Sequence, residues 1–375
     1  MMKTKAAVLT EMGRPFPYAE STPLRVEEIT LAGPGESEVL VELAAAGLCH
    51  SDLSVIDGSR PRVMPMVLGH EASGVVREVG TAVKDLVPGD HVIFSFVPVC
   101  GACSYCLQGR AALCEPGAKA IVAGTLLSGA RHFSDPGSAI NHHLGVSAFS
   151  ELTFVARESL VKIDKSLPLD IAALFGCAVL TGVGAVLNTA KVEAEDSVAV
   201  FGLGGVGLSM VIGASYAKAF PIIAVDRLDD KLELARQVGA THTVNASEVD
   251  AVEAVKQITS GGADHVFEGV GSEQVLIQSY QATRRGGTTI TAGLPHPEKM
   301  FTIPAFSLVA EERTVKGSYM GSCLPSRDIP TYIEMHLKGM LPIERLRTHT
   351  IKLDEINVGF DRLAEGKAVR QVIEF

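Results

Sequence analysis

The sequence of 375 residues contains no tryptophan, and aromatic residues make up only 5% of it. Long hydrophobic runs are also missing: no stretch of 18 apolar residues occurs, so a membrane-spanning helix is not expected. The chain has no basic run and a net charge of −10, which argues against nucleic acid or an anionic membrane as its main partner. Apolar residues nevertheless reach 47%. They are enough for a large core, and the length predicts two or three domains.

The chain also lacks a recognisable export signal at its start. Only four apolar residues, Ala6–Leu9, follow the opening Met-Met-Lys-Thr-Lys, which is too short for a signal peptide. A cytoplasmic protein is therefore expected. Its seven cysteines are an odd number, and four of them are clustered. In a reducing compartment this indicates metal binding rather than disulfides.

The cysteine cluster has the spacing Cys-x2-Cys-x2-Cys-x7-Cys, with short turns at Gly101 and Gly109 that let the backbone wrap around a centre. Four thiolates about 2.3 Å from a metal make a closed tetrahedral zinc site, which is structural rather than catalytic. The predicted ligands of this structural zinc are Cys100, Cys103, Cys106 and Cys114.

The first half of the chain has the pattern of a β domain. Short alternating segments at 39–43, 74–79 and 90–94 are separated by Gly and Pro turns, which predicts a barrel-like all-β unit. Residues 115–146 show no clear periodicity, so we expect a long surface loop there.

The pattern changes near residue 170. Pro168 precedes a segment, 169–188, with apolar residues at helical spacing, which predicts one helix. From there on, strands and helices alternate, which is typical of a parallel sheet covered by helices. The final fifty residues could close either domain. The expected strands are 198–200, 222–225, 265–268, 287–292 and 372–375, and the expected helices are 206–218, 231–238 and 331–337.

A dinucleotide-binding motif lies in this second half. The strand at 198–200 runs into Gly202-x-Gly204-x-x-Gly207 and then a helix, and the next strand ends in Asp226. The glycines allow a tight turn and close approach of a pyrophosphate, and the carboxylate can accept hydrogen bonds from ribose hydroxyls. Asp226 repels a 2′-phosphate and so favours NAD, whereas Arg227 could pair with that phosphate. Lys231 could reach the ribose or could simply be solvated.

A second, incomplete set of metal ligands lies outside the cysteine cluster. Cys49, His70 and Cys177 would give three protein ligands with one open position, the pattern of catalytic zinc. Taken singly, Cys177 in an apolar helix or a lone His70 is more simply a packed core residue. Spacing alone does not bring the three together, so both interpretations stay open at this point.

The order of these motifs resembles the zinc-containing medium-chain alcohol dehydrogenase family, in particular its liver-type branch, from about residue 5 to the C-terminus. The resemblance implies an α/β two-domain fold with a GroES-like β-barrel catalytic domain and a Rossmann parallel-sheet domain. The expected catalytic domain is 1–178 with 321–375, and the expected Rossmann domain is 179–320.

The resemblance also assigns roles around a catalytic zinc held by Cys49, His70 and Cys177, which makes two zinc ions per chain. It implies that Ser51 hydrogen-bonds the substrate oxygen and begins proton removal. Asp52 orients the His70 ring, a role that is common around metal ligands. Glu71 lies behind the zinc and can bind it transiently, and His50 contacts the cofactor pyrophosphate.

For the cofactor, the resemblance places Thr181 and the stretch 292–294 beside the nicotinamide and Arg370 at the pyrophosphate. Phe96 and Leu294 would line an apolar alcohol pocket. The expected NAD contacts are Thr181, Gly202, Leu203, Gly204, Gly205, Val206, Gly207, Asp226, Lys231, Ala292, Gly293, Leu294 and Arg370.

The implied activity is reversible oxidation of a primary or secondary alcohol to an aldehyde or ketone, by hydride transfer to NAD from a zinc-bound alkoxide. A polyol dehydrogenase or a dehydrogenase of the formaldehyde–thiol adduct is the alternative. Ser54 stands where the branch often has a proton-relaying histidine, and 115–118 lacks the arginine that holds the thiol adduct's carboxylate. A non-enzymatic homologue is disfavoured because no zinc ligand is missing. The long segment after Cys114 resembles that of dimeric members, so we expect a homodimer.

Overall fold

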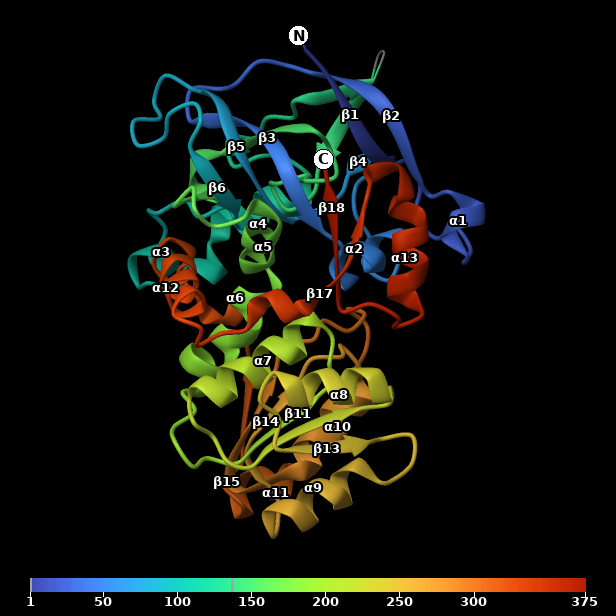
Figure 1. Cartoon of the computed structure of the whole chain (residues 1–375), viewed down its shortest axis with the longest axis vertical. Coiled ribbons are helices and arrows are strands. Elements are labelled where there is room, and N and C mark those ends of the chain that lie inside the picture. Colours follow the sequence, from blue (N-terminus) through green and yellow to red (C-terminus); the bar gives the residue numbers. More distant parts are fainter. Residues whose placement is uncertain (1, 136–137) are drawn as a thin grey trace. The chain divides into compact units, whose positions relative to one another are not determined.

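A computed structural model of the protein describes residues 2–135 and 138–375 (Figure 1). The chain divides into two compact units. The first runs to Cys177 and includes Leu324–Pro330 and Arg347–Phe375, and the second comprises Ala178–Cys323 and Thr331–Leu346. The domain boundaries expected from the sequence stay a prediction.

The first unit contains a small closed barrel. Strands β1 and β2 pair antiparallel from Met2 opposite Leu31 to Leu9 opposite Leu24. Apolar side chains form one core cluster there. Among them are Phe133 and Ile140, which are 1% and 2% exposed. Around the barrel the order is β1 (Met2–Leu9), β2 (Leu24–Leu31), β7 (Phe133–Asp135), β8 (Ser138–His142) and β4 (Met66–Val67).

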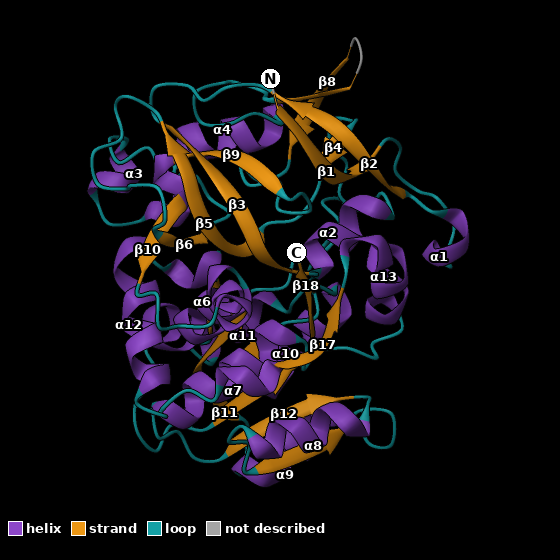
Figure 2. Ribbon diagram, turned by 45° about the horizontal axis from the view of Figure 1, so that its top comes forward, coloured by secondary structure: helices purple, strands orange, loops and turns teal. Residues whose placement is uncertain are grey.

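A second sheet of this unit is built around the long strand β3 (Glu38–Gly47), which lies beside β5 (Glu71–Val79) in both views (Figures 1 and 2). Gly74 permits this close pairing, because a Cβ there would lie 2.3 Å from the Glu42 carbonyl oxygen. The expected β-rich GroES-like unit is confirmed. The neighbours of β3 and β5 are β6 (His91–Phe94), β9 (Leu152–Ala156), β10 (Leu160–Ile163), β17 (Arg347–Ile351) and β18 (Arg370–Glu374).

The expectation of one long loop over 115–146 is wrong. The segment begins with helix α4 (Glu115–Ala123), which Pro116 helps to start and which Gly124 ends in a left-handed conformation at φ +67°. It continues through β7 and β8 of the barrel. Residues 136 and 137 of the expected loop lie outside the described residues. These elements are short, which explains why no periodicity was visible.

The second unit is a parallel sheet with helices packed on it (Figure 2), as the alternating pattern predicts. The central strand β11 is buried along its whole length, which is typical of strands covered on both faces. The strand order is β13 (His242–Asn245), β12 (Ile222–Asp226), β11 (Val198–Phe201), β14 (Ala263–Glu268), β15 (Thr283–Thr291) and β16 (Thr314–Gly317). Its packed helices are α7 (Gly205–Tyr216), α8 (Asp229–Gln237), α9 (Ala251–Thr259) and α10 (Glu273–Ala282).

The single helix expected over 169–188 is also a wrong prediction, because it breaks at Cys177, where φ is −137° and ψ −73°. Apolar periodicity continues through this break and so does not reveal it. The pieces are α5 (Leu169–Ala172), η3 (Ala173–Gly176), α6 (Ala178–Gly184) and η4 (Ala185–Ala190). In the part of the chain that the structure describes, no single helix is long and apolar enough to cross a membrane; the bent pair 169–176 and 178–190 reaches that length and composition only when both halves are joined.

Further helices, from three to 13 residues long, connect the remaining segments. They are α1 (Tyr18–Ser21), α2 (His50–Ile56), α3 (Ser104–Leu107), η1 (Ala111–Leu113), η2 (Arg157–Ser159), α11 (Ala305–Ala310), η5 (Met320–Ser322), α12 (Pro325–Leu337), η6 (Ile343–Leu346), η7 (Leu353–Glu355) and α13 (Ile356–Ala364).

A buried carboxylate joins β3 to the segment before β7. Glu38, 2% exposed, accepts hydrogen bonds from His132 Nε2 (2.6 Å), Ser128 Oγ (2.6 Å) and the Gly35 amide (2.7 Å). Burial opposes ionisation, but these hydrogen bonds lower the pKa of Glu38 from the ordinary 4.5 to about 2. The carboxylate therefore stabilises the fold in its ionised form.

We expect Glu38→Gln to lower the free energy of unfolding by about 1–3 kcal/mol near neutral pH, because three donors, of which His132 is buried, lose a charged acceptor. A carboxyl with a depressed pKa in the folded state stabilises it above the unfolded pKa, and that stabilisation is lost as the pH falls from 4.5 towards about 2. The difference between the two proteins should therefore shrink in that interval. Urea denaturation at several pH values measures it, with the exposed Glu36→Gln as control; a difference independent of pH would contradict the assignment.

Candidate metal centres and dinucleotide site

Three predicted ligands of the catalytic metal come from three separate turns of the first unit. Cys49 is the extended residue before helix α2, with φ −126° and ψ 150°. His70 directly precedes β5 and follows Gly69, whose φ is +89° and whose added Cβ would lie 2.7 Å from the Phe149 amide nitrogen. Only glycine fits there. Cys177 stands at the break between η3 and α6.

The structure brings these three side chains together. One ligand atom from each of Cys49, His70 and Cys177 lies within 4.8 Å of the others, and Cys177 Sγ is 3.4 Å from His70 Nε2. All three residues are at most 6% exposed. Ligand atoms around a tetrahedral zinc are separated by roughly 3.5 Å or slightly more, given bonds of about 2.0–2.3 Å. Two thiols and one imidazole at this spacing fit a zinc ion with a fourth position open.

Asp52 fixes the orientation of the His70 ring. Its fully buried carboxylate accepts hydrogen bonds from His70 Nδ1 (3.1 Å) and from the Gly69 amide (3.0 Å). With Nδ1 protonated and bonded to Asp52, the lone pair of Nε2 faces the two cysteine sulfurs. A carboxylate behind a ligating histidine is a common arrangement at zinc sites.

Interactions within the cluster shift the pKa values of Cys49 and His70. The hydrogen bond with the Cys177 thiol, assisted by the His70 charge and opposed by burial, holds the pKa of Cys49 well below its usual value. Burial alone would lower the pKa of His70, but the charges of Asp52 and Cys49 hold it well above the ordinary range. A thiolate is thus available at Cys49, and metal binding would displace a proton from the cluster.

Glu71 and Arg370 form a buried pair next to this centre. Arg370 Nε lies 3.4 Å from Glu71 Oε1, and both side chains are at most 3% exposed. Gly47 makes room for the carboxylate, because its added Cβ would lie 2.4 Å from Glu71 Oε1. Burial works against the guanidinium charge, while the charges of Glu71 and Cys49 raise the pKa of Arg370. Arg370 therefore stays cationic.

Two aromatic rings contact His70, and the residue pattern alone predicts neither contact. Phe96 and His143 each lie edge-to-face with it, at 5.7 Å between ring centroids. His143 is 1% exposed and its Nε2 is 3.4 Å from Asp52 Oδ1. Sequence reasoning missed His143, because only the pair of adjacent histidines at 142 and 143 marks it.

Helix α2 carries the other polar residues predicted near the metal. Ser51 is half-buried in its first turn, and His50 is exposed. The Ser54 hydroxyl donates to the His50 carbonyl oxygen at 2.8 Å. Ser54 is therefore engaged within its own helix.

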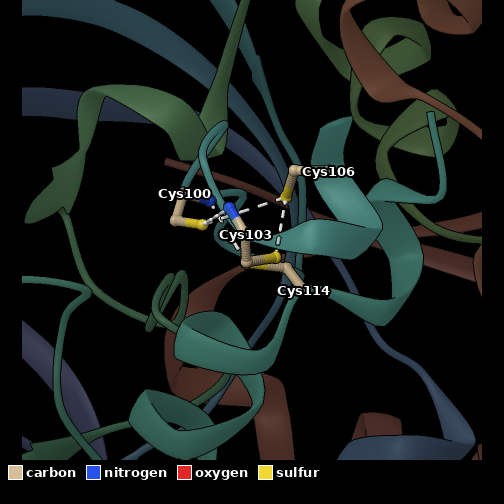
Figure 3. A group of neighbouring side chains, drawn as sticks. All are labelled: Cys100, Cys103, Cys106 and Cys114. Carbon is tan, nitrogen blue, oxygen red and sulfur yellow. Dashed lines mark hydrogen bonds between the residues drawn. The ribbon is translucent and has the colours of Figure 1, made fainter. Parts of the chain in front are cut away.

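The cysteine cluster forms a second centre in the first unit. Its four side chains turn toward one another (Figure 3), with one sulfur from each within 4.8 Å of the others. The Cys103 and Cys106 sulfurs are 3.5 Å apart. Backbone amides point at the sulfurs, from Cys103 to Cys100 Sγ (3.3 Å) and from Gly117 to Cys114 Sγ (3.4 Å). Such donors stabilise thiolates, so the cluster can hold zinc.

The glycine motif of the second unit has the geometry that a dinucleotide turn requires. Gly202 follows β11 with φ +89°, and an added Cβ at Gly207 would lie 1.8 Å from the Gly202 carbonyl oxygen. Gly204 has open space instead, where a phosphate could approach. Asp226, at the end of β12, accepts a hydrogen bond from the Leu203 amide at 2.7 Å. The carboxylate is thereby held beside the turn.

The other predicted cofactor residues of this unit lie on separate elements. Thr181 is 7% exposed in α6, and Lys231 is half-exposed in α8. The amides of Ala292 and Gly293 donate to the Glu268 carbonyl oxygen at 3.0 and 3.2 Å.

Sequence reasoning missed the Glu268 carboxylate, which holds the strand ends around Ala292 and Gly293 in place. It is 1% exposed and accepts from the Val270 and Gly271 amides and from Thr291 Oγ1, at 2.6–2.7 Å. No sequence signal distinguishes it from an ordinary strand-end acid.

Comparison with known proteins gives a consistent picture. The sequence model of the alcohol dehydrogenase GroES-like domain matches residues 35–165, and that of zinc-binding dehydrogenases matches residues 205–338. An S-(hydroxymethyl)glutathione dehydrogenase of Escherichia coli is 40% identical over 378 residues, covering 100% of both chains.

Solved structures that resemble this chain include proteins named as alcohol dehydrogenases. An alcohol dehydrogenase zinc-binding domain protein from Burkholderia ambifaria has a TM-score of 0.93 at 34% identity and covers 100% of this chain and 99% of its own. Benzyl alcohol dehydrogenase from Acinetobacter calcoaceticus has a TM-score of 0.93 at 31% identity, covering 100% of both chains.

We expect Asp52→Asn to lower the affinity of the Cys49–His70–Cys177 centre for zinc about 10–100-fold, because the amide no longer fixes the His70 ring. Competition with a chelator, with bound zinc measured by mass spectrometry, tests this. The exposed Asp57→Asn, at the other end of the same helix, serves as control. Equal zinc retention in both variants would show that Asp52 does not support the ligand.

Proposed function

This chain belongs to the zinc-containing medium-chain alcohol dehydrogenase family, and from that premise we propose that it oxidises a primary or secondary alcohol reversibly to the aldehyde or ketone, with NAD as acceptor. The observation that carries the proposal is the buried cluster of Cys49, His70 and Cys177, whose ligand atoms lie within 4.8 Å of one another. The Cys100–Cys114 cluster would hold a second, structural zinc.

Cys49, His70 and Cys177 would hold a zinc ion that stabilises negative charge on the alcohol oxygen, while NAD accepts the hydride. The residues around these three ligands would orient the ligands and carry protons. Asp52 keeps the Nε2 lone pair of His70 directed at the cysteine sulfurs. Ser51, two residues after Cys49, would hydrogen-bond the substrate oxygen and take its proton.

Ser54 does not extend a proton path from Ser51, since its hydroxyl donates to the His50 carbonyl oxygen. The proton then leaves through His50, which is exposed, or through the ribose hydroxyls and water. Arg370 and His50 would contact the pyrophosphate, and Glu71 would remain behind the metal.

The second unit would bind the dinucleotide. Gly202, Gly204 and Gly207 would shape the turn around the phosphates. Asp226, which accepts a hydrogen bond from the Leu203 amide, would accept hydrogen bonds from the ribose hydroxyls. This carboxylate would repel a 2′-phosphate, which favours NAD over NADP despite the exposed Arg227.

A second candidate substrate is the formaldehyde–glutathione adduct. It is favoured by the relative at 40% identity that is named for that substrate. It is disfavoured by residues 115–118, Glu-Pro-Gly-Ala, which contain no arginine. A polyol is less suitable, because Phe96 places an apolar ring against His70.

The partner proposed for the chain is a second copy of itself. Helix α11 leaves Phe306 and Val309 each 82% exposed, and Met300 nearby in sequence is 79% exposed. Exposed apolar side chains of this size mark protein contact surfaces when they gather in one place. The edge strand β16 follows them in the same unit.

The catalytic proposal predicts that the purified protein oxidises benzyl alcohol or longer aliphatic alcohols with NAD faster than with NADP. Cys49→Ala should lower kcat/KM about a thousandfold or more, since zinc contributes several kcal/mol to such reactions. Cys323→Ala, which removes a buried thiol of the second unit, is the matched control. Steady-state kinetics with ethanol, benzyl alcohol and S-(hydroxymethyl)glutathione separates the substrate candidates. Unchanged turnover in Cys49→Ala would refute the mechanism.

The homodimer proposal predicts twice the chain mass in light scattering. A double substitution, Phe306→Glu with Val309→Glu, should yield monomers, because it places charges on the surface that would be buried between copies. The exposed Val122→Glu controls for added charge. A tetrameric mass, or an unchanged dimer in the double variant, would contradict this assignment.

A further inference from the structure

His143 is a buried histidine beside the predicted metal ligands whose ring makes no hydrogen bond. It is 1% exposed, and among the residues that the structure describes neither its Nδ1 nor its Nε2 has a hydrogen-bond partner. Buried polar atoms are mostly hydrogen-bonded, because an unpaired one has lost its hydration without compensation. A phenylalanine ring could pack on the same neighbours without that cost. Packing therefore does not explain the two ring nitrogens.

The backbone holds His143 against the segment that leads to β5. The His143 amide donates to Ser147 Oγ (2.9 Å), which in turn donates to the Val67 carbonyl oxygen (2.8 Å). The Ala148 amide donates to the Gly69 carbonyl oxygen at 3.0 Å. These hydrogen bonds fix the point from which the His143 side chain extends.

From that point the side chain reaches Asp52. His143 Nε2 lies 3.4 Å from Asp52 Oδ1, and the ring stands edge-to-face on His70, with 5.7 Å between centroids and 70° between planes. One atom from each of the three side chains lies within 4.8 Å of the others. An N–H···O hydrogen bond is about 2.7–3.2 Å long. A movement of a few tenths of an ångström would therefore let Nε2 donate to Asp52.

The Asp52 carboxylate has acceptor capacity left for this donor. A carboxylate can accept about four hydrogen bonds, and Oδ1 accepts two, from the Gly69 amide (3.0 Å) and from His70 Nδ1 (3.1 Å). Within the described part of the chain, Oδ2 accepts none, although it too lies 3.1 Å from His70 Nδ1. Asp52 is 0% exposed, so bulk water does not meet the remaining capacity. An unused donor and an unused acceptor thus lie next to each other.

We propose that His143 is a positioning residue of the metal centre. With its proton on Nε2, it donates to Asp52 and completes a chain from His143 through Asp52 to His70. A further donor limits the rotation of the carboxylate, and the carboxylate fixes the ring of the metal ligand. His143 does not contact the metal and acts through Asp52. This role rests on zinc binding at the Cys49–His70–Cys177 centre, as the proposed function requires.

The test uses His143→Phe, which keeps the ring and removes both nitrogens. It should weaken zinc retention at the Cys49–His70–Cys177 centre roughly three- to tenfold in competition with a chelator, with bound zinc counted by mass spectrometry. His143→Gln should recover part of the loss, because its amide can donate in place of Nε2. Cys49→Ala, which leaves only the four-cysteine site complete, identifies the zinc that the chelator removes first.

Two further variants separate this role from packing. His142→Phe makes the same change at the preceding residue, which is 0% exposed and faces Phe133 with 4.8 Å between ring centroids. It should leave zinc retention at the centre within about twofold. In an Asp52→Ala background, His143→Phe should have a further effect of less than about twofold, because the acceptor is gone.

Zinc retention in His143→Phe equal to that of the wild type or of His142→Phe would overturn the role of His143. So would an undiminished effect in the Asp52→Ala background. Should Asp52→Ala fail to fold, His143→Gln decides, since a loss as large as that of His143→Phe would show that the donor is not what matters. All these outcomes leave the zinc enzyme standing. A wild type that holds only the zinc of the four-cysteine cluster would overturn the proposed function as well.

Discussion

The hydrogen bonds accepted by the buried Asp52 carboxylate link the chain segments on which the metal centre depends. One comes from the Gly69 amide and one from His70 Nδ1, so a single side chain of α2 fixes both the backbone and the ring of the segment before β5. Cys49 lies three residues before Asp52, at the start of the same helix. The distance between thiolate and imidazole is therefore set by one short helix and one turn, before any metal binds.

The third ligand, Cys177, could not be assigned from the sequence pattern, because its position depends on the tertiary structure. An unbroken helix over 169–188 would have buried this thiol among its apolar neighbours, and the sequence pattern favours such a helix. The backbone instead breaks at Cys177, and its sulfur lies 3.4 Å from His70 Nε2. The break leaves no mark in composition, because residues on both sides are apolar and buried.

Elements with strong local signals could be predicted from the sequence. The alternating strands around β3 and β5, the βαβ pattern and the glycine turn before α7 were all visible, because periodicity and glycine act within a few residues. The helix and barrel strands between 115 and 142 were missed, since short elements at barrel edges have little periodicity. His143 and Glu268 were missed because their surroundings are assembled from distant segments. The four-cysteine cluster was predicted, since its ligands are neighbours in sequence.

That cluster also has a consequence for how the first unit is held together. Helix α3, between Cys103 and Cys114, buries none of its residues, so hydrophobic packing contributes little to the lobe formed by residues 101–110; apolar burial resumes at Ala111 and Ala112. A metal bound to the four sulfurs would take the place of a core, much as crosslinks do in very small domains. The order of the lobe would then depend on metal supply and on the oxidation state of the thiols more than on apolar burial. The protein would carry a region whose order follows the redox and metal state of its surroundings while the sheets beside it remain folded.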